Sequence, residues 1–285
     1  MIERQTEHTE YLLFEHLASI PGLVHAVFTR KRGFSAAPFA GLNASFTTGD
    51  DAEIVRRNKA AIIETLGLAL LGARPVHGNT AIIVERDDLR DETGETTPAV
   101  ARLQGRLRHT DADAMLSDAP GFAFCWAFGD CSPILLYDPA HHAFALVHAG
   151  WRGAAGAVAP QAIQTMRRRW GTRPSDLLVG IGPSIGACCY EVNEQVRERF
   201  AANPLAWESA RFVEREPEGG GQGTGLYLDI PESNYQQLLA AGVAPEHIEM
   251  SEHCTGCRTD LFFSHRREPW PSGRFAVAIG LRGEK

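Results

Sequence analysis

Hydrophobic and polar positions recur along the chain with two periods, and each period predicts a different kind of element. From Asp51 to Leu66 the apolar residues recur at helical spacing, acidic residues open the segment, and Gly67 follows it. This pattern predicts a helix. Residues 154–170 and 231–241 show the same period, and the first of these has three arginines in its last turn and Gly171 directly after it. We therefore expect three helices in these places.

Short apolar runs bounded by turn residues predict strands. They lie at residues 25–30, 81–85, 122–128, 133–138, 143–148, 176–182 and 274–281. Strands and helices do not alternate regularly, which favours an α+β fold with mixed sheets. Two polar or glycine-rich stretches, 90–111 and 214–225, are expected to be loops. Because they do not separate two domains, we expect a single domain that spans residues 1–285.

Composition narrows the class of protein. The chain has 285 residues and a formal net charge of −7, which disfavours binding to a nucleic-acid backbone. No apolar run approaches the ~20 residues of a membrane-spanning helix, and no secretory signal is visible. Six cysteines are too sparse for a disulfide framework, so we expect a cytoplasmic protein. A phosphate-binding GxxxxGK[ST] loop is absent, so ATP-dependent chemistry has no support.

The apolar runs on either side of "PAHH" (139–142) predict a β-hairpin. If Asp138 and His141 close the turn, Cys131 lies directly opposite His148, with Cβ atoms about 4.5–5.5 Å apart. A thiolate and an imidazole at that distance can bind one metal ion, or act as a nucleophile and its base. A shift of one residue would place them on opposite faces, so the prediction depends on the turn.

The segment "HAGWRG" (148–153) favours a functional site over the purely structural role that a buried cysteine often has. Its glycines allow close backbone approach, and the helix that follows offers free N–H groups to an anion. Arg152 adds a bidentate donor for carboxylate or phosphate. A zinc site also needs a third ligand. His77 is a candidate from its loop setting, although the chain has 11 histidines, and the CxxC of "HCTGC" (253–257) competes.

A four-cysteine zinc site would need a second pair of ligands beside Cys254 and Cys257. The pair available is Cys188 and Cys189, whose adjacent spacing is unlike that of the usual ligand pairs. We therefore do not expect this CxxC to form such a site or to bind the catalytic metal. A redox role stays open, although no thioredoxin-like pattern surrounds it.

The segments "GDCSPILLYD", "VHAGWRG", "GPSIGACCYEV" and "CT…FFSHRR" together resemble the laccase-domain family. This family is also known as multicopper polyphenol oxidases and as zinc-dependent purine nucleoside phosphorylases, and it includes a bacterial peptidoglycan-editing factor. The resemblance extends from about residue 28 to the C-terminal "RFAVAIGL". It implies an α+β fold in which two central sheets form a sandwich with outer helices.

The resemblance also implies roles for single residues. The implied metal ligands are His77, Cys131 and His148. Catalytic roles are implied for Cys131, His148 and Arg152, and substrate-binding roles for Arg30, Asn43 and Arg152. The chain departs from the family pattern at Pro75, Gly129 and Arg32, where the family usually has Gln, Ala and Gly. These departures leave the ligands intact and bear on substrate preference.

The implied function is zinc-dependent phosphorolysis of purine nucleosides, with adenosine deaminase and methylthioadenosine phosphorylase activities beside it. Two histidines and one cysteine would leave a fourth zinc position open, as in catalytic sites. Copper-dependent phenol oxidation is disfavoured, because a trinuclear copper cluster needs His-x-His pairs and the sequence has none. A cysteine hydrolase using Cys131 and His148, and an enzyme that edits a peptidoglycan precursor, are the alternatives.

Overall fold

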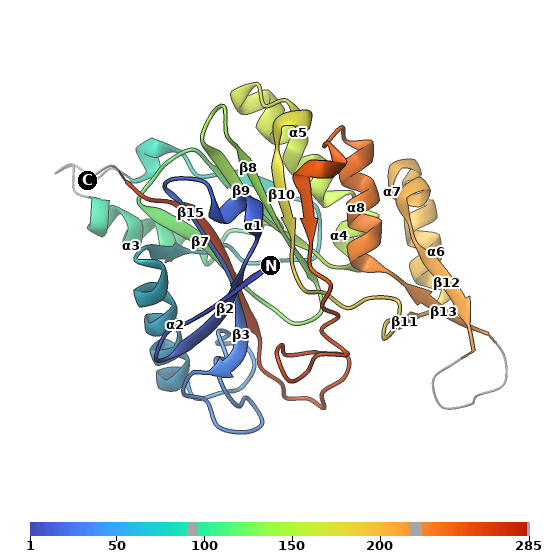
Figure 1. Ribbon diagram of the computed structural model, residues 1–285, viewed down its shortest axis with the longest axis horizontal. Coiled ribbons are helices and arrows are strands. Elements are labelled where there is room, and N and C mark those ends of the chain that lie inside the picture. The colour runs from blue at the N-terminus through green and yellow to red at the C-terminus, as the bar shows by residue number, and fades with distance from the viewer. Residues whose placement is uncertain (90–95, 217–223, 284–285) are drawn as a thin grey trace.

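Two six-stranded mixed sheets form the centre of the computed structural model, which describes residues 1–89, 96–216 and 224–283 (Figure 1). The first sheet has the order β1-β2-β3-β15-β7-β4. Its strands are β1 (Ile2–Gln5), β2 (Thr9–Leu13), β3 (Leu23–Arg32), β4 (Ala69–Leu71), β7 (Phe122–Phe128) and β15 (Phe275–Leu281).

The second sheet has the order β14-β10-β8-β9-β6-β5. Its strands are β5 (Ala81–Ile83), β6 (Ala114–Ser117), β8 (Ser132–Asp138), β9 (Ala143–Ala149), β10 (Leu178–Ile181) and β14 (Ile248–Met250). A small third sheet has the order β11-β13-β12 and is made of β11 (Glu191–Val192), β12 (Phe212–Arg215) and β13 (Gly225–Leu228).

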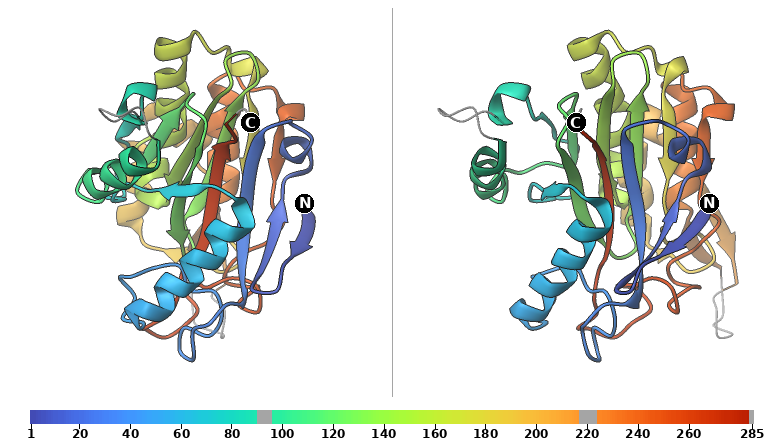
Figure 2. Two further views of the ribbon diagram at one scale, coloured as in Figure 1. Left: turned by 90° about the vertical axis from the view of Figure 1, so that its left-hand side faces the viewer. Right: turned by 60° about the vertical axis from the view of Figure 1, so that its left-hand side comes forward.

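Helices cover the outer faces of the two large sheets (Figure 2). The α-helices are α1 (Glu15–Ala18), α2 (Ala52–Leu66), α3 (Thr96–Leu107), α4 (Trp151–Ala155), α5 (Val158–Trp170), α6 (Glu194–Ala201), α7 (Pro204–Ser209) and α8 (Ile230–Ala240). Ile62 and Leu66 of α2 join the apolar cluster on the first sheet, and Ile163 and Met166 of α5 join that on the second. The α+β sandwich with outer helices is therefore confirmed. None of the helices in the described ranges is long and apolar enough to cross a membrane.

The main core lies between the two sheets. Phe122 and Phe124 of β7 contact Phe144 of β9, with ring centroids 5.7 and 5.2 Å apart. Every residue of β8 and β9 is buried, because the opposite sheet covers one face and helices cover the other. Strands covered on both faces appear in a sequence as continuous apolar runs, which is why these two were predictable.

The predicted helices form, with one correction. Asp51 caps α2 by accepting hydrogen bonds from the backbone N–H groups of Glu53 and Ile54, and Gly67 ends it at φ +65°. The predicted helix 154–170 is instead two helices, α4 and α5, separated at Ala157, which has the left-handed φ of +56°. The first of them, α4, begins three residues earlier than predicted, at Trp151.

The two segments predicted as loops contain a helix and parts of two strands. Within 90–111 the structure has α3, so the prediction of a loop is wrong there, and residues 90–95 lie outside the described part of the chain. Within 214–225 the strands β12 and β13 pair antiparallel, and residues 217–223 lie outside the described part.

The predicted hairpin forms from β8 and β9, but its register differs from the prediction. Asp138 pairs with Ala143 and Pro133 pairs with His148. The turn therefore has four residues rather than two. The Asp138 carboxylate accepts hydrogen bonds from the N–H groups of Ala140 and His141 and so holds His141 in the turn, out of the ladder. The register shift is even, so Cys131 and His148 stay on the same face as diagonal neighbours.

Candidate metal centre

Three metal-type donors converge where strands of the second sheet end. His77, Cys131 and His148 each offer one ligand atom, and these three atoms lie within 4.8 Å of one another. Cys131 precedes β8, His148 lies near the end of β9, and His77 lies in the loop between β4 and β5. The two imidazole ring centroids are 4.9 Å apart. The structure thus brings together the three residues that the family resemblance implied as ligands.

Asp113 positions both histidines, and sequence reasoning missed it. Its fully buried carboxylate accepts hydrogen bonds from the backbone N–H groups of His77 at 2.8 Å and Gly78 at 2.7 Å. It also lies 3.4 Å from Nδ1 of His148. These contacts hold the loop in which His77 has a φ of +58°, and they leave the other nitrogen of His148 for a metal or a thiolate.

The electrostatics of the cluster favour a thiolate. Burial opposes ionisation, but the charges and hydrogen bonds of His148 and His77 lower the pKa of Cys131 to about 6. Burial also opposes the charged form of His148, yet the Cys131 thiolate and Asp113 raise the pKa of His148 to about 9. The thiolate is the form of cysteine that binds metals and attacks electrophiles.

Gly150 leaves the space that these donors need. A Cβ at this position would lie 2.5 Å from Sγ of Cys131 and 3.8 Å from Nδ1 of His77. Imidazole and thiolate donors suit zinc and copper better than magnesium or calcium. The donor chemistry, the spacing and the Asp113 support therefore fit a zinc ion with an open fourth position.

A cavity of about 240 Å³ opens onto the cluster. Its lining residues are His77, Gly129, Asp130, Cys131, Gly150, Trp151, Arg152, Ile185, Tyr190, Ile230, His265 and Arg266. The Arg152 guanidinium lies 4.3 Å from the ring centroid of Trp151, and that of Arg266 lies 4.6 Å from the ring centroid of Tyr190. Among the described residues, no carboxylate is found within ion-pairing distance of Arg152. The cavity thus combines aromatic faces with a cation able to meet an anion.

Asp130 fixes the wall of the cavity that carries Arg266. Its carboxylate accepts hydrogen bonds from the hydroxyls of Thr255 and Ser264 and from the backbone N–H of Arg266, each at 2.7 Å. Asp130 itself has a φ of +92°, an unusual conformation for a residue with a side chain. A buried carboxylate with three donors is well compensated, so this network orients the loop after β14 toward the cavity.

Arg30 and Asn43 are not among the cavity-lining residues. The Arg30 guanidinium donates to Glu268 at 2.6 Å and lies 4.1 Å from the Phe263 ring centroid. Asn43 is fully buried, where it donates to Asp50 and accepts from the backbone N–H of Arg274. Both side chains already have partners within the protein, so the structure does not bring them to the three-donor cluster.

Sequence reasoning missed Asp113, Tyr190, His265 and Arg266. The last three belong to "CCYEV" and "SHRR", which carried the family resemblance without an assigned role. Asp113 had no signal in the sequence, because its importance arises only when the loop of His77 and strand β9 meet around it in the fold.

These features define an α+β sandwich with a His–Cys–His donor cluster at the floor of a cavity. The chain matches the family described as "Multi-copper polyphenol oxidoreductase laccase" over residues 24–282, and it belongs to that family. It is 35% identical over 271 residues to "Purine nucleoside phosphorylase YlmD" of Geobacillus stearothermophilus, which covers 92% of each chain.

Two further similarities bear on fold and chemistry. The chain is 30% identical to "Adenosine deaminase RL5" of an unknown prokaryotic organism, across 92% of this chain and 95% of that protein. The crystal structure of YlmD from Geobacillus stearothermophilus superposes with a TM-score of 0.81 at 32% identity, across 98% of both chains. The chain is therefore similar over nearly its whole length to proteins named as nucleoside-processing enzymes.

Proposed function

We propose that this protein is a zinc-dependent purine nucleoside phosphorylase, residues 1–285 forming one domain. The observation that best supports this proposal is the convergence of His77, Cys131 and His148 at a cavity that Arg152 also lines. The names of relatives with 30–35% identity support this substrate class. A cytoplasmic location belongs to the proposal, supported by six cysteines that are all free thiols.

The residues of the site would bind the metal, the phosphate and the purine base. His77, Cys131 and His148 would hold zinc, which when bound supplies Lewis-acid charge beside the reacting atoms. Arg152 offers phosphate a bidentate contact. Because α4 has only five residues, its N-terminus adds little to that contact, and the guanidinium is the main anion donor.

The aromatic side chains give the base a surface to pack on. Trp151 and Tyr190 both line the cavity, and a flat purine suits such faces. Burial raises the pKa of Tyr190 to about 12, so its hydroxyl stays protonated at neutral pH and can donate a hydrogen bond to the substrate.

Two further activities would use the same site. Adenosine deamination is supported by the relative named adenosine deaminase, and methylthioadenosine phosphorolysis would need room for a different 5′ substituent on the same nucleoside. Hydrolysis through Cys131 is the second candidate function. It is supported by the lowered pKa of that thiol beside His148, an arrangement shared by cysteine hydrolases.

The proposed reaction is tested by following hypoxanthine release from inosine across phosphate concentrations. We expect release to require phosphate and to yield ribose 1-phosphate. Arg152→Ala should lower kcat/KM roughly ten- to hundredfold, since a charge-assisted contact is worth about 1.5–3 kcal/mol. Arg173→Ala, at an arginine whose side chain is 81% exposed, should leave it unchanged. Undiminished release without phosphate would exclude a phosphorylase.

The metal is tested separately by measuring zinc in protein purified without added metal. Cys131→Ser should lose zinc from this site together with activity, because a neutral hydroxyl is a poor substitute for a thiolate. Cys125→Ala, at a buried cysteine of β7, should retain both. A Cys131→Ser protein that keeps all its zinc while losing activity would favour the cysteine hydrolase instead.

A further inference from the structure

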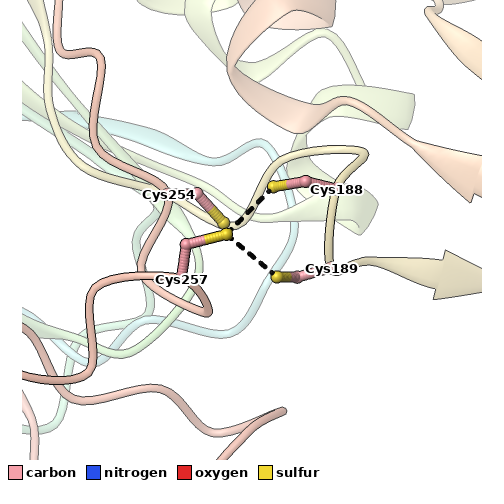
Figure 3. A group of neighbouring side chains, drawn as sticks. All are labelled: Cys188, Cys189, Cys254 and Cys257. Carbon is pink, nitrogen blue, oxygen red and sulfur yellow. Dashed lines mark hydrogen bonds between the residues drawn. The ribbon is translucent and has the colours of Figure 1, made fainter. Parts of the chain in front are cut away.

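A second cluster of metal-type donors consists of four cysteines that the proposed function does not use. The sulfur atoms of Cys188, Cys189, Cys254 and Cys257 all lie within 4.8 Å of one another. Sγ of Cys257 is 3.4 Å from Sγ of Cys188 and 3.4 Å from Sγ of Cys189. Figure 3 shows the four side chains pointing toward one another from two separate loops.

The four sulfur atoms converge although Cys188 and Cys189 are adjacent, a spacing unlike that of the usual ligand pairs. The two pairs come from segments about 65 residues apart, which the parallel pairing of β10 with β14 brings side by side. A further bridge between Ser184 and Cys254 continues that pairing into the loops. Spacing within each pair therefore matters less than the fold, which places both pairs around one point.

The separations match those of a tetrahedral thiolate site. Zinc–sulfur bonds of about 2.3 Å in a tetrahedron place sulfur atoms about 3.8 Å apart. Two of the sulfur–sulfur distances are 3.4 Å and all four sulfur atoms lie within 4.8 Å of one another, so the observed separations are compatible with this value. A single disulfide would join two of these sulfur atoms with a bond of about 2.05 Å. It would not explain why the other two sulfur atoms lie at the same point.

The surrounding backbone is built closely around the sulfurs. The N–H of Gly186 donates to Sγ of Cys254 at 3.4 Å, a contact that favours a thiolate. A Cβ at Gly256 would lie 2.8 Å from Cβ and 3.0 Å from Sγ of Cys189, so the loop can approach only because this residue is glycine. Four thiols with such support form a closed site with no position for substrate.

We propose that Cys188, Cys189, Cys254 and Cys257 bind a structural zinc ion, separate from the three-donor centre. Binding releases the thiol protons to solvent as the four zinc–sulfur bonds form. The ion would tie the loop after β10 to the loop after β14. These loops also carry Tyr190 and Thr255, the latter a partner of Asp130, so the zinc would hold one wall of the cavity in place.

Metal content tests this proposal in full-length protein purified under reducing conditions without added metal. We expect two zinc ions per chain in the wild type, one in Cys257→Ser and one in Cys188→Ser. Both of these cysteines are exposed, so their substitution leaves the core intact. Cys125→Ala should keep two. Wild-type zinc content in both serine variants, or a wild-type mass two daltons lower because of a disulfide, would overturn the proposal.

Cobalt substitution distinguishes this site from the three-donor centre. In Cys131→Ser protein loaded with Co²⁺, the intense thiolate-to-cobalt absorption should persist, since all four cluster cysteines remain. It should vanish when Cys257→Ser is added. Absence of the absorption in the single variant would contradict the second site, whereas phosphate-independent release of hypoxanthine would contradict the proposed function alone.

Discussion

Asp113 shows how much of the candidate site depends on a residue that binds neither metal nor substrate. Its carboxylate joins the loop of His77 to the ring of His148 through four contacts. Despite burial, the hydrogen bonds of His148 and Gly78 keep the pKa of Asp113 below its usual range, so it is charged at neutral pH. A charged partner on the second nitrogen of a ligand histidine sets its orientation and basicity.

We therefore expect Asp113→Asn to weaken metal binding at the three-donor centre by about ten- to a hundredfold. The amide keeps the shape but removes the charge. Affinity would be measured by competition with a chromophoric chelator, with folding checked by circular dichroism. Asp111→Asn is the matched control, because this carboxylate is half-exposed and pairs with Arg74. Equal affinities in the two variants would show that Asp113 has no part in the site.

At the residue scale, the sequence predicted which side chains lie close together better than it predicted how they are oriented. Cys131 and His148 were expected to be directly opposed, and they are instead diagonal neighbours, because Asp138 binds the turn and lengthens it. The even shift kept both on one face. The placement of Arg30 depended on Glu268, some 240 residues away, which no local pattern could reveal.

At the scale of elements, strands buried on both faces were the most predictable part of the fold. β7 and β15 are interior strands of the first sheet and were expected almost at their observed bounds. The edge strand β1 was not expected, since three of its four residues are exposed and its sequence is charged. Ala157, which divides α4 from α5, favours an uninterrupted helix by its own propensity, and the signals for a break lie beside it, in Gly156 and Pro160.

The contact between β10 and Phe14, the residue directly before α1, offers a test of how tightly the elements pack. A Cβ at Gly180 of β10 would lie 2.5 Å from Cδ2 and 2.6 Å from Cε2 of Phe14, whose side chain is fully buried. We expect Gly180→Ala to destabilise the protein by about 1–3 kcal/mol through overpacking. Urea unfolding would measure the loss.

Gly105 is the control for that substitution. It lies inside α3 and is exposed, and a Cβ added to it would meet no described atom within 4 Å. Gly105→Ala should therefore raise stability by about 0.5–1 kcal/mol, because alanine loses less backbone entropy in a helix. If both alanine variants were stabilised, the Phe14 ring would have to be far more mobile than its burial indicates.

At the scale of the whole molecule, the site depends on two sheets held face to face. Its three metal-type donors come from the second sheet and its connections, while Phe128 of the first sheet packs 5.4 Å from the ring of His148. His25 of β3 helps to join the layers, since its Nε2 accepts the backbone N–H of Phe14 at 2.9 Å, and Phe14 packs on Gly180. Stability of the sandwich and integrity of the centre are thus connected.

His25 also gives the sandwich a dependence on pH. Burial, aided by the charge of His16, lowers the pKa of His25 from 6.5 to about 4. The unfolded chain therefore takes up this proton first as the pH falls, so the folded state loses stability between about pH 6.5 and pH 4. Between pH 7.5 and pH 5.0 the loss from this one group should be about 2 kcal/mol.

Replacing the imidazole isolates this contribution. Gln at position 25 can still accept the hydrogen bond from Phe14 but does not titrate, so His25→Gln should lose less stability than the wild type on going from pH 7.5 to pH 5.0. Urea unfolding at the two pH values, with the same excess of chelator throughout, measures the difference and cancels the titration of groups common to both proteins. His8→Gln, at a histidine whose side chain is 41% exposed, should retain the wild-type pH dependence. An identical loss in all three proteins would mean that His25 is protonated in the folded state near its ordinary pKa, and that the layers separate enough there to admit water.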